Sequence, residues 1–486
     1  MAIIFCQAGQ CGNQLGFSIL DSLFRHLRGS GDADHMETFF RESVSSSSQS
    51  RLLARAVCID TEPKVVNECL SRSKREKHTW SYHTPNMLYR HGGAGNNWAM
   101  GYQMCSGDFL ESSIDCLRRE LECCDLPPML LTIHSTAGGT GSGLGTRITE
   151  AMCEEFPDAT RMNISITPYH FGEVVVQHYN SVLSLAKISD ASNAILTYEN
   201  EVAQDLCKKM RRIERPTIED INQTITASLV PILLPKYSTR RSTGRIASHL
   251  QDDVADLCSH PGFRFLDVRA TVFILKPLVF LQRQPPLIPP CHYPHFFFLP
   301  NKVKTTPQTS EKSIEFTYDS WTTLLSTLDK MHDRGTALDS RLGASAGDSS
   351  AEPAVNRSVG CVVTLRGVDA RENATAPYSV PVKVSPLTKQ SQPVGRFFSR
   401  ENFSVFVDEV HMHHSPHVVN GYQRSASMLC NGQTILPILQ RAASKAAELF
   451  RVGAYVHQYA SCGLEGEDFI QSFRTVGQVI ENYRGL

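Results

Sequence analysis

The stretch that decides the fold is Ala137-Gly138-Gly139-Thr140-Gly141-Ser142-Gly143. It directly follows the apolar run 130–133 and precedes a segment with helical periodicity, so we predict a strand, a tight turn and a helix. Glycines let the backbone approach phosphate oxygens, and the N–H groups at a helix N-terminus attract anions. We therefore expect a phosphate-binding loop here. For these seven residues alone, a glycine turn that merely ends a strand is an equally good interpretation.

Two better-known phosphate motifs are excluded. No lysine follows the last glycine, so the loop is not a GxxxxGK[ST] P-loop, and its glycine spacing does not give GxGxxG. The absence of GxGxxG also disfavours a dinucleotide-dependent oxidoreductase, as does the lack of a recognisable catalytic His/Tyr/Lys arrangement. Backbone amides, with the hydroxyls of Thr140 and Ser142, are left as the phosphate donors.

Short apolar runs alternate with helical patterns around this loop. The predicted strands are 2–6, 54–59, 130–134 and 163–167. The predicted helices are 12–27, 109–123 and 143–156. This βαβ rhythm predicts an α/β fold in which helices cover both faces of a Rossmann-like parallel sheet.

The later part of the chain predicts a different organisation. One long helix is expected over 217–234, begun by Thr217 with Asp220 three residues later and ended by Pro235. Further helices are expected over 432–450 and 465–483. The loops predicted from composition are the serine-rich 42–49, the Pro- and aromatic-rich 282–307, and 334–357, which is rich in Ser, Ala and Gly. The predicted division is 1–216, 217–237, 238–431 and 432–486.

Composition sets the compartment and the broad class of partner. The 48 Lys and Arg against 49 Asp and Glu give a formal net charge of -1, so we expect no nucleic-acid partner. The apolar runs are too short to span a bilayer and no secretory signal is recognisable, so no membrane insertion is expected. The 15 cysteines form no CxxC pair, which favours reduced thiols in the cytoplasm.

Three segments together resemble the tubulin superfamily. Gly9-Gln10-Cys11-Gly12-Asn13-Gln14, Gly93-Ala94-Gly95-Asn96-Asn97-Trp98 and the stretch 137–143 match, in order and spacing, the first, third and fourth nucleotide loops of tubulins. The resemblance covers nearly the whole chain apart from 282–307 and 334–357. It implies a Rossmann-like GTPase domain, an α+β intermediate domain and a C-terminal helical hairpin, with GTP or GDP and Mg²⁺ as cofactors. Within the superfamily, 54–57, 62–65, 172–181 and 454–459 resemble the delta branch.

The resemblance also implies roles for individual residues. The implied phosphate contacts are Gln10, Cys11, Gln14, Ala94, Gly95, Asn96, Ser135, Ala137, Gly138, Gly139, Thr140 and Gly141. The implied ribose contact is Glu173, the implied guanine contacts are Asn200 and Asn222, and the implied magnesium ligands are Asp60 and Glu62. Without the resemblance, residues 60–63 read better as an ordinary strand-ending turn, and the two asparagines as caps or turn residues.

Three positions need separate comment. Ile218 stands where tubulins usually carry an aromatic residue stacked on the base, so about 1 to 3 kcal/mol of stacking energy is expected to be missing. Asp252 matches the acidic residue that positions water in trans at the next subunit's γ-phosphate, although it and Asp253 equally suit a solvated helix end. Whether GTP is hydrolysed is therefore left open. The histidines at 411, 413, 414 and 417 suggest a metal, but we expect a solvated loop there.

Two functions follow from the resemblance. The first is a cytoskeletal, GTP-binding subunit that supports triplet microtubules in centrioles and basal bodies, with alpha/beta-tubulin, epsilon-tubulin and centriolar microtubules as partners. The second is a GTP-dependent regulatory or capping protein that never enters a microtubule lattice. The segment 282–307 makes the second plausible because it lies near the loop that tubulins use for lateral contacts, although it equally suits an unspliced piece of gene model.

Overall fold

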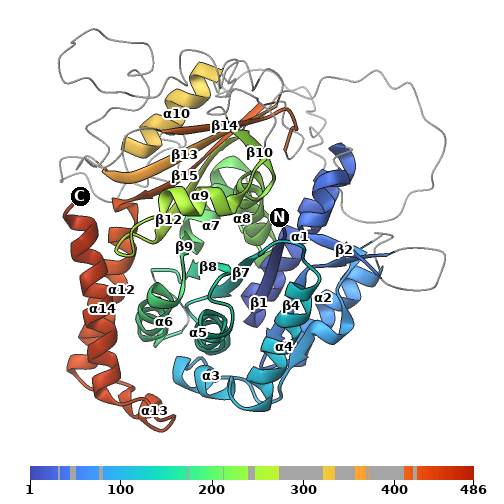
Figure 1. Ribbon diagram of the computed structural model, residues 1–486. Helices are drawn as coiled ribbons and strands as arrows, with labels where there is room; N and C mark the ends of the chain where they lie inside the picture. Colours follow the sequence, from blue (N-terminus) through green and yellow to red (C-terminus); the bar gives the residue numbers. More distant parts are fainter. Residues whose placement is uncertain are drawn as a thin grey trace, which may run out of the picture.

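One long twisted sheet runs through the molecule, with helices on both faces (Figure 1). The computed structural model describes residues 1–30, 33–43, 51–75, 80–170, 172, 174–211, 213–238, 247–272, 321–333, 356–367, 370, 410–419 and 424–486. The sheet has the strand order β11-β10-β14-β13-β15-β12-β9-β8-β7-β1-β4-β6. The strands from β9 to β6 are all parallel, which confirms the predicted α/β fold.

The parallel half is buried on both faces. Its strands are β1 (Ile3–Ala8), β4 (Ala56–Asp60), β6 (Met87–Tyr89), β7 (Met129–Ser135), β8 (Thr160–Thr167) and β9 (Ala194–Glu199). Alternate residues of β1 enter different cores: Ile3 and Phe5 pack with one cluster, and Ile4 and Cys6 with another. Such strands read as continuous apolar runs, because neither side of the sheet meets water. This is why short apolar runs located β1, β4, β7 and β8 with edges no more than three residues from the prediction, whereas β6 and β9 were not predicted.

The two faces carry different helices. On one face lie α1 (Gly9–Ser30), α2 (Pro63–Arg75) and α8 (Ile218–Leu233). On the other face lie α4 (Asp108–Glu122), α5 (Gly145–Glu155) and α6 (Gln177–Ala191). The predicted helix over 143–156 is divided in the structure, because a π-helical turn, η3 (Thr140–Leu144), precedes α5.

Helix α8 begins and ends as predicted. The Thr217 hydroxyl accepts the Asp220 N–H at 3.2 Å and the Asp220 carboxylate accepts the Thr217 N–H at 2.9 Å, which completes a capping box. The C-cap is Leu234, directly before Pro235. Pro231 lies inside the helix, and the buried Arg366 guanidinium donates to the Pro231 carbonyl at 2.9 Å.

A mixed half extends the sheet beyond β9. Its strands are β10 (Lys236–Ser238), β11 (Ala247–Ser248), β12 (Phe265–Val272), β13 (Ser358–Gly367), β14 (His411–Ser415) and β15 (Arg424–Gly432). Strand β12 joins the halves, because Phe265 and Leu266 pair with β9 in parallel while Asp267 onward pairs with β15 in antiparallel. Among the described residues, the helices α9 (Leu250–Leu257) and α10 (Trp321–Asp333) pack against this half.

The expected solvated histidine loop is wrong. Residues His411–Ser415 form β14, and His413 and His414 are buried at 5% exposure each. Strand β14 pairs with both β13 and β10. The polar residues concealed a strand because each histidine finds a partner distant in the sequence. His413 Nε2 lies 3.6 Å from the buried Asp253 carboxylate, His411 Nδ1 lies 2.8 Å from Asp256, and His414 packs on the Tyr237 ring.

Three C-terminal helices complete the molecule. They are α12 (Leu436–Arg451), α13 (Val456–Ala460) and α14 (Gly466–Arg484), and α12 and α14 run side by side along one flank (Figure 1). Both pack against α6. The expected helix start at Gly432 is wrong: that glycine ends β15, where an added Cβ would lie 2.4 Å from Ser358 Oγ.

The remaining elements are short. The strands β2 (Phe40–Glu42), β3 (Leu52–Ala54) and β5 (Trp80–Ser81) form a separate sheet. The helical ones are η1 (Ala33–Thr38), η2 (Thr84–Asn86), α3 (Trp98–Met104), α7 (Asn200–Met210) and η8 (Gln433–Ile435). Of the predicted loops, 282–307, 334–355 and 44–49 lie outside the described residues. The predicted domain limits stay a prediction.

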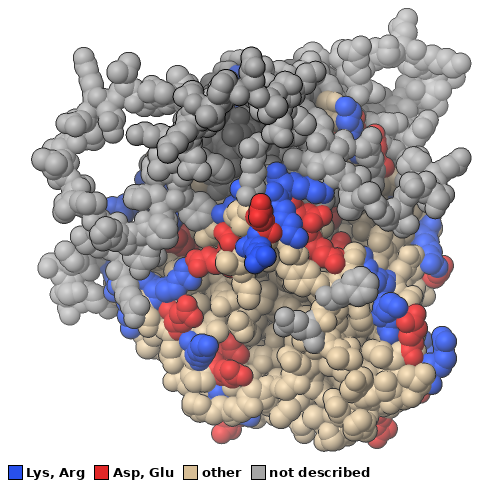
Figure 2. Space-filling view, turned by 180° about the vertical axis from the view of Figure 1, so that it is seen from behind, with Lys and Arg blue, Asp and Glu red and all other residues tan. Residues whose placement is uncertain are grey.

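Surface charge on the face seen in Figure 2 is mixed. Basic and acidic side chains alternate there and form no single-sign field among the described residues. No helix in the described ranges combines the length and apolar character needed to cross a membrane.

Candidate nucleotide site

Four loops meet at the carboxyl ends of β1, β4, β6 and β7. They are the first loop at 9–14, the turn at 60–63, which we call the second loop, the third loop at 93–98 and the fourth at 137–143. The backbones of the first and fourth loops touch, because a Cβ on Gly9 would lie 2.8 Å from Gly141 N. Gly9 also has a φ of +71°, which favours glycine. The second and fourth loops meet where the Thr61 and Thr140 hydroxyls lie 2.7 Å apart. The carboxyl edge of a parallel sheet is where α/β folds bind ligands.

The glycine turn sits between β7 and η3. A helix N-terminus leaves backbone N–H groups without acceptors inside the helix, and here it carries Gly138, Gly139 and Thr140. The Ser142 hydroxyl donates to the Gly138 carbonyl and closes the turn. The turn therefore combines backbone donors at a helix N-terminus with the absence of bulky side chains, as a phosphate cradle requires.

The buried side chain of His134 forms a hydrogen bond with this turn. Its Nδ1 lies 3.1 Å from the Gly141 carbonyl, which can only accept, so Nδ1 donates. Its Nε2 lies 3.1 Å from the Ser165 hydroxyl. Burial lowers the pKa of His134 to about 4, so the ring is neutral at physiological pH. Sequence reasoning missed this residue, although a histidine within an otherwise apolar strand is a visible signal.

The third loop packs directly on the fourth. Gly93, Gly95 and Asn96 have φ values of +63°, +52° and +55°, so the loop uses a backbone conformation that glycine and asparagine tolerate best. A Cβ on Gly139 would lie 2.7 Å from the Ala94 carbonyl. The implied contacts Ala94, Gly95 and Asn96 thus lie beside those at 137–141.

Asp60 ends β4, and Glu62 follows two residues later. Asp60 is buried at 4% exposure, and its carboxylate accepts the Thr61 N–H at 2.8 Å. Burial, together with the nearby Glu62 carboxylate, raises the pKa of Asp60 to about 6. A Cβ on Gly93 would lie 2.9 Å from Glu62 Oε1. Two carboxylates whose charges repel each other fit a hard divalent cation such as Mg²⁺.

The other predicted residues of the first loop open the helix α1. Gln10 is exposed, and Cys11 and Gln14 are half-buried. The helix approaches β7 so closely that a Cβ on Gly12 would lie 2.1 Å from the Ile133 carbonyl. Ser135 ends β7, and its hydroxyl accepts the Ala137 N–H at 3.2 Å.

The two residues implied to read guanine come from α7 and α8. Asn200 begins α7 directly after β9, and Asn222 lies in the second turn of α8 at 7% exposure. Among the described residues, no hydrogen bond joins either of them to the phosphate loops. Glu173 lies outside the described residues. Ile218, the first residue of α8, is 62% exposed, so an apolar side chain faces solvent where an aromatic ring was expected.

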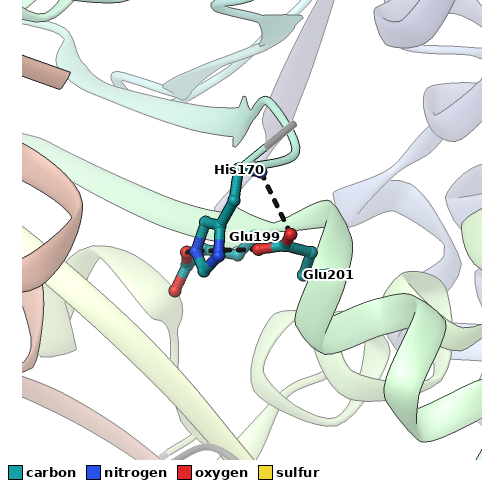
Figure 3. Close-up of side chains that lie close together, drawn as sticks. All are labelled: His170, Glu199 and Glu201. Carbon is teal, nitrogen blue, oxygen red and sulfur yellow. Dashed lines mark hydrogen bonds and ion pairs between the residues drawn. The ribbon is translucent and has the colours of Figure 1, made fainter. Parts of the chain in front are cut away.

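A charged cluster flanks Asn200 (Figure 3). His170 Nε2 lies 2.7 Å from Glu201 Oε2 and 3.6 Å from Glu199 Oε2, and one ligand atom from each lies within 4.8 Å of the others. That spacing suits one cation, but Arg441 of α12 already lies 3.0 Å from Glu199 Oε2. We therefore describe an ion-pair cluster that fixes the turn carrying Asn200. Sequence reasoning missed it, because its members come from separate elements.

Asp252 and Asp253 occupy very different environments. The Asp252 carboxylate accepts the His249 N–H at 2.8 Å and caps α9. Asp253 is buried at 1% exposure and paired with the equally buried Lys236. A solvated position is therefore wrong for Asp253, which is engaged with lysine and does not compete with Asp252 for an external water.

The chemistry of the described residues can be compared with that of the implied nucleotide and magnesium ion. The described residues offer a glycine turn at a helix N-terminus, a second positive-φ loop against it, and a pair of mutually repelling carboxylates at the adjacent strand end. These main-chain donors and carboxylate ligands fit a nucleoside triphosphate with a partly hydrated magnesium ion. The cation would be held by Asp60 and Glu62, and the phosphates by the main chain at 137–141.

Comparison with known proteins agrees with this geometry. Residues 2–208 match the Tubulin/FtsZ family, GTPase domain. The chain is 30% identical over 509 residues to the tubulin delta chain of Canis lupus familiaris, with 100% of both chains covered. It is 29% identical over 507 residues to that of Homo sapiens, again with 100% of both covered.

A more distant similarity covers only part of the chain. The tubulin beta chain of Porphyra purpurea is 31% identical over 274 residues, which is 54% of this chain and 57% of that protein. The two delta chains, in contrast, align with 100% of this chain, which includes the mixed half and the C-terminal helices. The chain therefore belongs to the tubulin family, and across its whole length it is similar to the delta-tubulins.

Proposed function

We propose that the protein binds GTP or GDP with Mg²⁺ at the meeting point of the four loops. The observation that carries this proposal is the direct packing of the third loop on the glycine turn, where Gly139 leaves no room for a side chain against Ala94 and Asn97. That packing brings the main chain of two segments together, although Gly139 and Ala94 are 45 residues apart in the sequence. Phosphate binding by amides needs no lysine.

Each group in the site has a task in this proposal. The amides at 137–141 hold the α- and β-phosphates and the third loop closes on the γ-phosphate. Asp60 and Glu62 hold the hydrated cation, and Asn200 and Asn222 read the base. The side chain at Ile218 contributes no ring to stack on guanine, so we expect weaker base selectivity than an aromatic residue would give.

The binding proposal is tested by identifying the nucleotide that copurifies with the chain. Denatured protein should release GTP or GDP in roughly stoichiometric amount, and stripped protein should bind GTP more tightly with Mg²⁺ than with EDTA. A matched control is Glu62→Gln, which keeps the shape of the side chain and should reduce only the magnesium-dependent part. A chain that acquires no guanine nucleotide in the presence of Mg²⁺ would refute the proposal.

We further propose that the protein acts as a cytoskeletal subunit that supports triplet microtubules at centrioles and basal bodies. Support comes from its full-length similarity to proteins named tubulin delta chain. Its partners would be alpha/beta-tubulin, epsilon-tubulin and centriolar microtubules. Depletion in a ciliated cell should leave doublets in place of triplets, and wild-type protein should restore them.

Hydrolysis would require Asp252 to act on the nucleotide of the next subunit. Its exposed position at the start of α9 supports this role, since the neighbouring Asp253 is buried with Lys236. Asp252→Ala should leave nucleotide binding unchanged and slow GTP turnover only in protein that cosediments with tubulin polymer. Equal turnover by wild type and variant in that polymer would remove Asp252 from the mechanism. A protein that binds GTP but never cosediments would instead be a regulator outside the lattice.

A further inference from the structure

Asn180 of α6 lies between the third and fourth loops, and its side-chain amide is saturated. Its Nδ2 donates to the Asn96 carbonyl and to the Ala137 carbonyl, each at 2.8 Å. Its Oδ1 accepts the Trp98 N–H at 2.9 Å and the Tyr459 hydroxyl at 2.6 Å. An amide has two donor hydrogens and two acceptor lone pairs, so one fully buried side chain uses its entire capacity to join both loops.

The fourth partner comes from a remote part of the chain. Tyr459 belongs to α13, is buried, and packs edge-on against Tyr179 and Phe469 at 5.5 and 5.3 Å between ring centroids. A second hydrogen bond joins α13 to the third loop, because Asn97 Nδ2 donates to the Gln458 carbonyl at 3.0 Å. Hydrogen bonds to α6 and to α13 therefore both hold the third loop in place.

A residue with a positive φ angle lies at each end of this hydrogen-bonded connection between the third loop and α13. Among the described residues, Asn96 and Tyr455 are the non-glycine residues with positive φ, at 55° and 60°. Residues other than glycine adopt such conformations only where the surrounding structure holds them. One of the two lies in the third loop and the other directly before α13. The Asn180 and Asn97 bonds lie between them.

We propose that Asn180 and Tyr459 are positioning residues that set the separation of the two phosphate loops, so that the C-terminal helices control nucleotide affinity and the preference for GTP over GDP. This inference rests on the proposed nucleotide site. The third loop is proposed to close on the γ-phosphate and the fourth to hold the other phosphates. A change in their separation therefore affects GTP more than GDP.

The test compares two single hydroxyl deletions. Tyr459→Phe removes the hydroxyl that holds Asn180 and leaves the ring packing in place. Tyr179→Phe is the matched control, because its hydroxyl donates to the Ala454 carbonyl at 3.0 Å in the same C-terminal segment. A lost hydrogen bond corresponds to an effect of about two- to tenfold. Tyr459→Phe should speed amide exchange at 94–98 and 137–141 by about that factor in nucleotide-free protein, and Tyr179→Phe should not.

Affinity measurements complete the test. Tyr459→Phe should weaken GTP binding about two- to tenfold and GDP binding by less, whereas a general loss of stability would weaken both equally. Exchange rates at both loops that match those of Tyr179→Phe would overturn the inference, as would an equal loss of GTP and GDP affinity. If wild-type protein binds no guanine nucleotide, the proposed function fails, and the exchange comparison in nucleotide-free protein still decides whether Asn180 and Tyr459 position the loops.

Discussion

Gly143→Ala is expected to separate the third and fourth loops by pure steric conflict. A Cβ on Gly143 would lie 2.1 Å from the Trp98 carbonyl oxygen and 2.5 Å from Tyr102 N, both in the backbone of α3. Contacts of a Cβ below 3.0 Å are essentially unknown, so α3 must move by about 1 Å, and overpacking of this kind costs about 1–3 kcal/mol. Because the clash is with backbone, we expect about 3 kcal/mol.

The assay for this variant combines urea unfolding with nucleotide binding. Displacement of α3 carries Asn96 and Asn97 away from the glycine turn, and a misplacement of about 1 Å can cost about 100-fold where geometry matters. GTP affinity should therefore fall at least about tenfold. Gly477→Ala is the control, since no atom lies within 4 Å of its Cβ and alanine in a helix should stabilise by up to about 1 kcal/mol. Unchanged stability and affinity in Gly143→Ala would refute the packing argument.

Three further variants test other parts of the structure. Ile218→Tyr should tighten guanine-nucleotide binding, since the exposed position accepts a ring and stacking contributes about 1–3 kcal/mol; an unchanged Kd in a fluorescence titration would show that the base lies elsewhere. Thr217→Ala should lower the free energy of unfolding by about 1 kcal/mol, because the Asp220 N–H loses its cap; urea titration measures this, and no loss would contradict the capping box. Lys236→Met should destabilise by about 3–5 kcal/mol at pH 8, where Asp253 would be left ionised and buried. That loss should shrink at pH 5, because burial raises the pKa of Asp253 to about 6 while Lys236 lowers it. The folded state loses stability as pH rises through the raised folded-state pKa of a buried carboxyl group. A loss of stability that is the same at pH 5 and pH 8 would therefore count against the buried pair.

The phosphate turn and its supporting strands could be predicted because their signals are local. The turn 137–143 needs small residues after a buried strand, and both properties are visible in consecutive letters. The cap at Thr217 is equally local, since its partner Asp220 lies three residues away. Even there, the π-helical turn Thr140–Leu144 was not predicted, because it forms where the glycine turn meets α3.

Other parts of the site could not be predicted, because their partners are distant in sequence. The bond from Tyr459 to Asn180 spans 279 residues, and the pairing of Arg441 with Glu199 spans 242. The strand His411–Ser415 was missed for the same reason, because its histidines contact Asp253, Asp256 and Tyr237, which lie more than 150 residues earlier in the chain.

By itself, the sequence determined the α/β class, the order of the nucleotide loops and the membership of the tubulin family. These follow from periodicity and short motifs, which depend on the chemistry of neighbouring residues. Only the tertiary structure decided which side chains hold the phosphate loops together and which carboxylate near 252 is available to water. Those outcomes depend on burial and on hydrogen bonds between residues 17 to 279 positions apart, and neither is encoded in any local pattern.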